Sequence, residues 1–64
     1  MIGMFFNTIM DKEEVFECIS EPCRRKLDDS SEDYFTVARR LRDDKCYLIK
    51  VIDIKLISHN KDQV

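Results

Sequence analysis

One stretch of the chain, residues 46–57, constrains the fold more than any other. Nine of its twelve residues are apolar, and five of those nine are Ile or Val. β-Branched residues at this density are typical of a strand that is buried on at least one face. The sequence therefore predicts a β-sheet, and the next question is what the rest of the chain can pack against it.

The chain has little material for that task. Its 64 residues predict one small domain over residues 1–64, which buries only about 60% of the surface that its unfolded form exposes. The apolar content of 44% and the net charge of −2 are those of a chain that collapses rather than of a disordered one. We expect a folded domain of marginal stability that gains from self-association or from a partner.

The strand-like run Tyr34–Val37 precedes this stretch and suggests a hairpin with a polar turn at residues 42–45. We expect four cross-strand pairs, namely Leu41 with Cys46, Arg39 with Leu48, Val37 with Lys50, and Phe35 with Ile52. A competing interpretation makes residues 32–43 a helix, with Ser31 as its N-cap and an apolar stripe on one side.

The region from Asp11 to Leu27 reads as a helix. Asp11 can cap its first turn, and Glu14 follows three residues later as in a capping box. Because Pro22 removes a backbone hydrogen bond, we expect a kink or break there. An apolar stripe at helical spacing contains Val15, Phe16, Ile19, Cys23 and Leu27.

These elements, with a weak strand over Ile2–Ile9, predict an α+β fold in the order β-α-β-β. Its small antiparallel sheet carries one kinked helix on one face. The alternative order, β-α-α-β, replaces the second strand by the competing helix.

Side chains alternate along a strand, so the hairpin has two faces. The helix is expected to cover the face that carries Phe35, Val37, Leu41, Cys46, Leu48, Ile52, Ile54 and Leu56. The other face is expected to stay uncovered unless the N-terminal segment or another protein lies on it, since large apolar patches usually mark interaction surfaces. That face carries Tyr34, Thr36, Ala38, Arg40, Tyr47, Ile49, Val51, Asp53, Lys55 and Ile57.

Catalytic chemistry finds little support in the sequence. The single histidine, His59, lies in a polar segment, and one glycine cannot form a phosphate-binding loop. The three cysteines lack the short spacing of zinc ligands and are expected to be free thiols. We expect no enzymatic activity, no cofactor and no metal.

Two basic clusters, residues 24–26 and 39–42, support a different hypothesis. A small nucleic-acid-binding regulator would contact phosphates through these side chains. Acidic residues follow each cluster at once, which is more typical of a solvated surface laced with ion pairs. The candidate phosphate contacts are Arg24, Arg25, Lys26, Arg39 and Arg42.

The leading hypothesis is a non-enzymatic protein-binding regulator or inhibitor, of the kind common in phages and mobile elements. It would act in the cytoplasm through the uncovered sheet face or a strand edge, on a larger protein or as a homodimer, with no role for a membrane. The candidate contacts are Tyr34, Arg40, Tyr47, Ile49 and Val51, because Tyr and Arg often dominate interface energetics.

Overall fold

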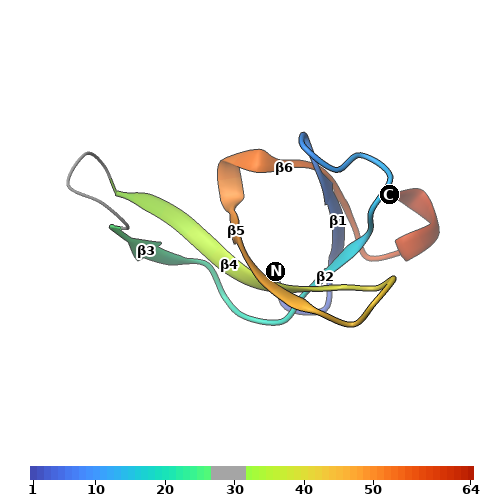
Figure 1. The fold of residues 1–64 in the computed structure, drawn as a ribbon, viewed down its shortest axis with the longest axis horizontal. Coiled ribbons are helices and arrows are strands. Elements are labelled where there is room, and N and C mark those ends of the chain that lie inside the picture. The colour runs from blue at the N-terminus through green and yellow to red at the C-terminus, as the bar shows by residue number, and fades with distance from the viewer. Residues whose placement is uncertain (27–31) are drawn as a thin grey trace.

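The computed structural model describes residues 1–26 and 32–64, and over these ranges the protein is an antiparallel β-structure (Figure 1). Its helical content there is limited to two three-residue 3-10 turns, so the predicted α+β fold with a kinked helix is wrong. The elements are β1 (Phe5–Thr8), β2 (Phe16–Cys18), β3 (Cys23–Arg25), β4 (Asp33–Arg40), β5 (Cys46–Lys50), η1 (Val51–Asp53), β6 (Ile54–Ser58) and η2 (Lys61–Gln63).

The strands pair in the order β3-β4-β2-β1-β6, and β5 pairs with β4. Strands β2 and β3 use successive parts of β4, because Cys18 lies opposite Ala38 and Cys23 lies opposite Phe35. The sheet curls strongly, and in Figure 1 strands β1, β2, β4, β5 and β6 follow one another around a ring. The result is a small, partly open barrel.

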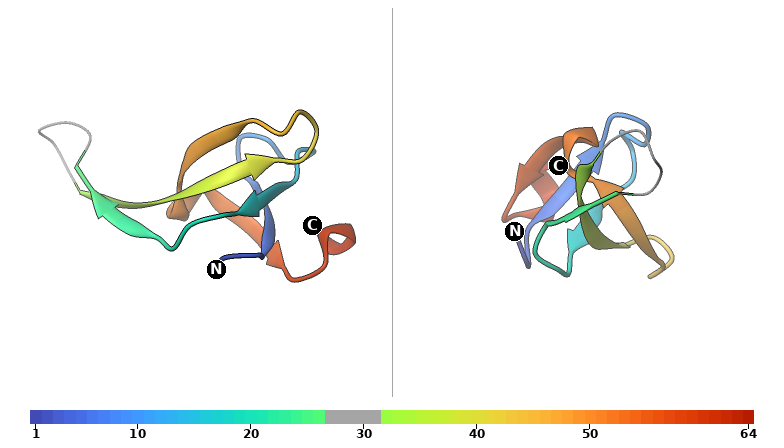
Figure 2. Two further views of the ribbon diagram at one scale, coloured as in Figure 1. Left: turned by 90° about the horizontal axis from the view of Figure 1, so that it is seen from below. Right: turned by 90° about the vertical axis from the view of Figure 1, so that its left-hand side faces the viewer.

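The hairpin of β3 and the first part of β4 extends away from this body as a two-stranded arm (Figure 2). The arm makes the molecule elongated, with principal extents of 38 × 20 × 20 Å. All three residues of β3 are exposed, so the arm adds little to the core. Ser31, the N-cap of the competing helix, lies outside the described residues, and residues 33–40 of that helix form β4 instead.

The core sits where β1, β2 and β4 meet. Phe6, Phe16, Cys18 and Ala38 are buried together, and the rings of Phe6 and Phe16 stack with their centroids 5.6 Å apart. Alternation places these side chains inside, whereas Glu17, between two of them, points outward to Arg39. Three half-buried side chains pack against the cluster, namely Met1, Ile49 and Ile54.

The predicted helix over residues 11–27 is replaced by a turn and two strands. The expected cap forms only a tight turn, in which the Glu14 N–H donates to the Asp11 carbonyl over 3.2 Å. After this turn the chain forms a strand and not a helix, because Phe16 and Cys18 become buried when β2 pairs with β1 and β4. Pro22 separates β2 from β3 instead of kinking a helix.

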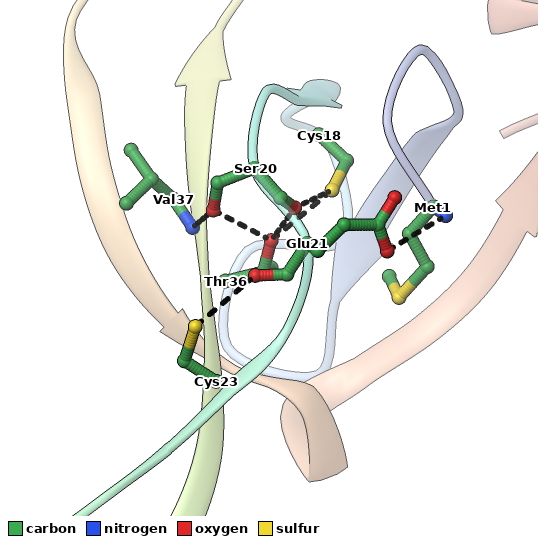
Figure 3. Close-up of polar contacts among 7 residues, drawn as sticks. All are labelled: Met1, Cys18, Ser20, Glu21, Cys23, Thr36 and Val37. Atoms are coloured by element: carbon green, nitrogen blue, oxygen red, sulfur yellow. Dashed lines mark hydrogen bonds and ion pairs between the residues drawn. The ribbon is translucent and has the colours of Figure 1, made fainter.

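A cluster of small polar side chains joins β2 to β4 at this break (Figure 3). The Ser20 hydroxyl accepts the Val37 N–H over 2.9 Å, and the Thr36 hydroxyl donates to the Ser20 carbonyl over 2.7 Å. The Cys18 thiol also donates to that carbonyl, over 3.0 Å. Thr36 and Cys18 are fully buried, so the cluster supplies hydrogen bonds where the β2–β3 segment leaves regular pairing.

The predicted hairpin of β4 and β5 is present, but its register is two residues away from the predicted one. Arg39, not Leu41, lies opposite Cys46, and Val37 lies opposite Leu48. The turn over residues 41–44 closes this register with Asp44 in a left-handed conformation (φ 62°), which Asp tolerates better than most residues. The strand predicted over residues 46–57 is interrupted by η1.

A shift of two residues preserves the two faces of the hairpin, yet the face expected to lie uncovered is the one that points inward. Thr36 and Ala38 are fully buried on it, and Ile49 packs on the core. The face expected under a helix instead includes Leu48, which is exposed. The inversion has a clear cause: Phe6 and Phe16 cover the inner face from β1 and β2, and no helix is present among the described residues to cover the outer one.

Candidate functional site

A groove lies between β5 and the segment that follows β1. It has a volume of about 400 Å³ and is predominantly apolar. We call it the seam groove, because it lies where the curled sheet stays open between β5 and the β1 side. Its lining residues are Thr8, Met10, Asp11, Phe16, Phe35, Arg40, Tyr47, Leu48, Ile49, Lys50 and Asp53.

Four consecutive residues of β5, Tyr47 to Lys50, line the groove. Successive side chains of a strand point to opposite faces, so a groove on one face would meet only every second residue. A groove that meets all four follows the length of β5. Because β5 pairs with β4 alone among the described strands, its other edge is open.

The hydrogen bonds of the hairpin identify which backbone groups lie on that edge. The Arg40 N–H donates to the Lys45 carbonyl over 2.8 Å, so this pair is a hydrogen-bonded one. Hydrogen-bonded and non-hydrogen-bonded pairs alternate along an antiparallel ladder. The pairs of Tyr47 with Ala38 and of Ile49 with Thr36 are therefore hydrogen-bonded ones. Leu48, opposite Val37, belongs to a non-hydrogen-bonded pair, so its N–H and C=O point away from β4.

The opposite side of β4 confirms this alternation. Val37, the partner of Leu48, turns its own N–H to the Ser20 hydroxyl and accepts the Ile19 N–H over 3.0 Å. Its backbone groups thus point toward β2 and not toward β5. Leu48 is left with a free donor and a free acceptor at the middle of the β5 edge, since β5 pairs only with β4 among the described strands.

Aromatic side chains form the inner surface of the groove. Phe16, Phe35 and Tyr47 line it from three different strands, and the rings of Phe16 and Tyr47 meet edge to face with centroids 6.3 Å apart. Tyr47 presents most of the accessible aromatic surface, because Phe16 and Phe35 are buried.

Arg40 stiffens this aromatic surface. Its guanidinium lies 4.8 Å from the centroid of Tyr47 and donates two hydrogen bonds to the Asp43 carboxylate. These bonds raise the pKa of Arg40 above its ordinary value and hold the pKa of Asp43 well below the usual carboxylate range. The contact fixes Tyr47 in place through a cation–π interaction.

Exposed aliphatic side chains flank the groove. Met10 is 84% exposed and Leu48 45%, and both line it. Ile52, 72% exposed, precedes the lining residue Asp53 in η1, and the Ile9 N–H bonds to the Asp53 carbonyl. Exposed aliphatic residues that border an aromatic concavity are typical of an interaction surface.

The structure brings together three of the five side chains that the sequence suggested as partner contacts. Arg40, Tyr47 and Ile49 all line the seam groove. Tyr34 lies on the arm, 55% exposed, and Val51 is a half-buried residue of η1. Sequence reasoning missed Met10, Phe16 and Phe35, because only the closure of the sheet brings β1, β2 and β4 to the same groove.

The candidate phosphate contacts do not form one surface. Arg24 and Arg25 lie on β3, beside the start of β4, whereas Arg39 lies near its end, about 16 Å away for five residues of strand. Carboxylates already bind three of the five cations; Arg24 pairs with Glu32, Arg42 with Glu14, and Arg39 with Glu17 and Asp44. The hydrogen bonds that Arg39 donates to Glu17 and Asp44 also raise its pKa. Lys26 follows β3 and is exposed.

The residues with reactive or metal-binding side chains are dispersed. Cys18 is buried and Cys23 and Cys46 are exposed, all three as free thiols. Within residues 1–26 and 32–64, no three His, Cys, Asp or Glu side chains are grouped as metal ligands would be. His59 is exposed just after β6. The seam groove is therefore the candidate site among the described residues.

Comparisons with known protein families, with curated proteins and with solved structures found no match to this chain. In the described part of the chain, no helix has the length and apolar character needed to cross a membrane. The geometry of the seam groove is therefore the basis for a functional proposal.

Proposed function

We propose that this protein is a non-enzymatic protein-binding module, a regulator or inhibitor that receives an extended segment of a larger protein in the seam groove. The segment adds as a strand to the free edge of β5. The observation that carries the proposal is the position of Leu48, which lines an apolar groove and directs its N–H and C=O away from β4 at the middle of β5. Strand addition of this kind gives affinity through main-chain hydrogen bonds and specificity through side-chain pockets.

The chemistry of the groove suits such a guest. An added strand supplies the acceptor and donor that Leu48 lacks, and guest side chains on one face of that strand can contact the exposed ring of Tyr47. Apolar burial contributes roughly 25 cal/mol for each Å² removed from water, so covering the exposed lining residues Met10, Tyr47 and Leu48 is worth a few kcal/mol before the costs of ordering the guest.

The strand edge is a better docking element than the sheet face expected from the sequence. The inner face is already occupied by Phe6 and Phe16, so a partner cannot lie flat against Ile49. The edge offers the same residues, Tyr47 and Ile49, from the side. Two exposed thiols, Cys23 and Cys46, suit a protein that acts in a reducing compartment such as the cytoplasm.

Self-association through β5 is opposed by charge. Lys45 directly precedes the strand and is exposed, and a lysine at the end of an edge strand discourages the edges of two copies from pairing. Phosphate binding is opposed by the carboxylates that hold Arg24, Arg39 and Arg42. A heterologous protein segment is therefore the guest that the groove favours.

A peptide selection tests the proposal. A displayed library of random dodecapeptides is selected on the immobilised chain, and binders are measured against a variant with an N-methyl group on Leu48, assembled by ligation at Cys46. The methyl group removes the outward N–H but no bond to β4, so we expect binding to weaken at least tenfold while the fold persists. Leu48→Ala is the matched control, since it trims the side chain and retains the N–H.

Three results would contradict the proposal. Peptides that bind the N-methyl variant as well as the unmodified chain would show that the β5 edge is not used. A concentration-dependent dimer in sedimentation, lost on N-methylation, would identify the guest as a second copy. Binding of duplex DNA that weakens steeply with salt would favour the nucleic-acid hypothesis.

A further inference from the structure

We infer that the segment received in the seam groove is cationic, an extended peptide in which apolar side chains alternate with Lys or Arg. The inference rests on the proposed function and adds the chemistry of the guest. It comes from the charged side chains that line the groove, which are Asp11, Arg40, Lys50 and Asp53.

The two cations of this set are already neutralised within the chain. Arg40 is held by Asp43 through two hydrogen bonds and lies over Tyr47. The Lys50 ammonium lies 3.6 Å from the Asp33 carboxylate. Neither side chain presents an uncompensated positive charge to a guest.

The two carboxylates differ in this respect. Within residues 1–26 and 32–64, neither Asp11 nor Asp53 takes part in an ion pair. Their basic neighbours in the sequence, Lys12 and Lys55, are exposed and do not line the groove. The groove therefore carries two uncompensated negative charges beside an apolar aromatic surface.

Position makes these charges useful for selecting a guest. Asp11 follows the β1 side of the groove and Asp53 belongs to η1, directly after β5, so the carboxylates come from separate elements that border the same concavity. A guest strand on the β5 edge directs alternate side chains toward and away from the aromatic floor. Lysine and arginine side chains are long, so their charged ends can bend back to Asp11 and Asp53 at the rim of the groove while the alternate apolar side chains face its floor.

The opposite charge is disfavoured by the same geometry. An acidic guest would place its carboxylates beside Asp11 and Asp53, and like charges at an interface are a common source of discrimination between partners. The preference is thus expected to appear as a difference between peptides that share one apolar pattern and differ only in charge.

The test uses three synthetic octapeptides that alternate valine with lysine, glutamine or glutamate. Their affinities for the full chain are measured by fluorescence anisotropy at low salt. We expect the lysine peptide to bind at least tenfold more tightly than the glutamate peptide, with the glutamine peptide between them. Asp53→Asn and Asp11→Asn should each weaken the lysine peptide roughly three- to fivefold and leave the glutamine peptide unchanged. Asp62→Asn, in η2, is the matched control and should change neither.

The outcomes separate this inference from the proposed function. Equal affinities for the three peptides, all lost on N-methylation of Leu48, would overturn the cationic guest and leave edge pairing intact. A lysine preference that survives N-methylation would contradict edge pairing, and the inference that rests on it. No binding of any peptide at millimolar concentration would contradict both. Self-association of the chain that excludes the lysine peptide would make a second copy the occupant.

Discussion

The two sides of the curled sheet differ in how far their side chains are buried and their strand edges paired. On the closed side, β1, β2 and β4 meet over Phe6, Cys18 and Ala38, which are completely buried. On the seam side, β5 keeps an unpaired edge and an exposed Leu48 beside an aromatic groove. Among the described residues, no buried side-chain nitrogen or oxygen lacks a hydrogen-bond partner, so the closed side is complete by itself. The difference shows that the incomplete part of this fold is a strand edge and not a sheet face.

The largest effect is expected from truncation on the closed side. Phe6→Ala removes a fully buried ring that stacks on Phe16, and such substitutions cost about 3–5 kcal/mol. In a 64-residue domain this change should leave much of the population unfolded. The measurement is urea unfolding followed by circular dichroism. Leu48→Ala on the seam side is the comparison and should cost less than about 1 kcal/mol. Equal losses for the two variants would break the distinction between the sides.

A smaller effect is expected from the polar cluster between β2 and β4. Thr36→Val retains the shape of the side chain but leaves the Ser20 carbonyl without its 2.7 Å donor, which should destabilise the protein by about 1–3 kcal/mol. Thr36→Ser retains the hydroxyl and should lose less. Urea unfolding of both variants provides the measurement. If the valine variant is the more stable of the two, the Thr36 hydroxyl does not stabilise the segment between β2 and β3.

The smallest expected effect concerns pH and the Arg40–Asp43 pair beside the seam groove. Hydrogen bonding to Arg40 lowers the pKa of Asp43 in the folded chain, so the carboxylate stabilises the fold above its unfolded-state pKa of about 4. That contribution is lost as the pH falls toward the lower folded-state pKa.

Asp43→Asn should therefore reduce the melting temperature at pH 7, and its difference from the unmodified chain should shrink as the pH is lowered below 4. Asp62→Asn should show no such dependence. A difference that grows toward low pH would contradict the assigned sign.

The local parts of the fold could be predicted from the sequence. The hairpin of β4 and β5 follows from alternation and from the polar turn between them, and both its strands are present. Its register could not be predicted, because the turn closes through the left-handed backbone of Asp44 and a hydrogen bond from Arg40 to Lys45.

The helix was predicted because short segments are ambiguous. Val15, Phe16, Ile19 and Cys23 fit a helical stripe, yet the same segment holds the alternation Phe16–Glu17–Cys18. Pairing on both sides of β2, with β1 and β4, decides in favour of the strand. Those contacts are distant in sequence, and they also decide which face of the hairpin is buried.

The candidate site was predictable in part for the same reason. Arg40, Tyr47 and Ile49 were identified from the strength of the β5 signal and the composition of one face, and all three line the seam groove. The proposal that a guest contacts them at the strand edge rests on the hydrogen-bond alternation around Leu48, which the sequence does not reveal. The residues from β1, β2 and the adjoining loop needed the closed sheet to be known.

Amide hydrogen exchange measured by NMR tests the free edge most directly. In the chain alone, the amides of Tyr47 and Ile49 should be protected by β4, whereas the Leu48 amide between them should exchange much faster. On addition of a peptide that occupies the seam groove, the Leu48 amide should become protected as well. A Leu48 amide that is as protected as Ile49 in the free chain, or that stays unprotected while the peptide is bound, would contradict the account.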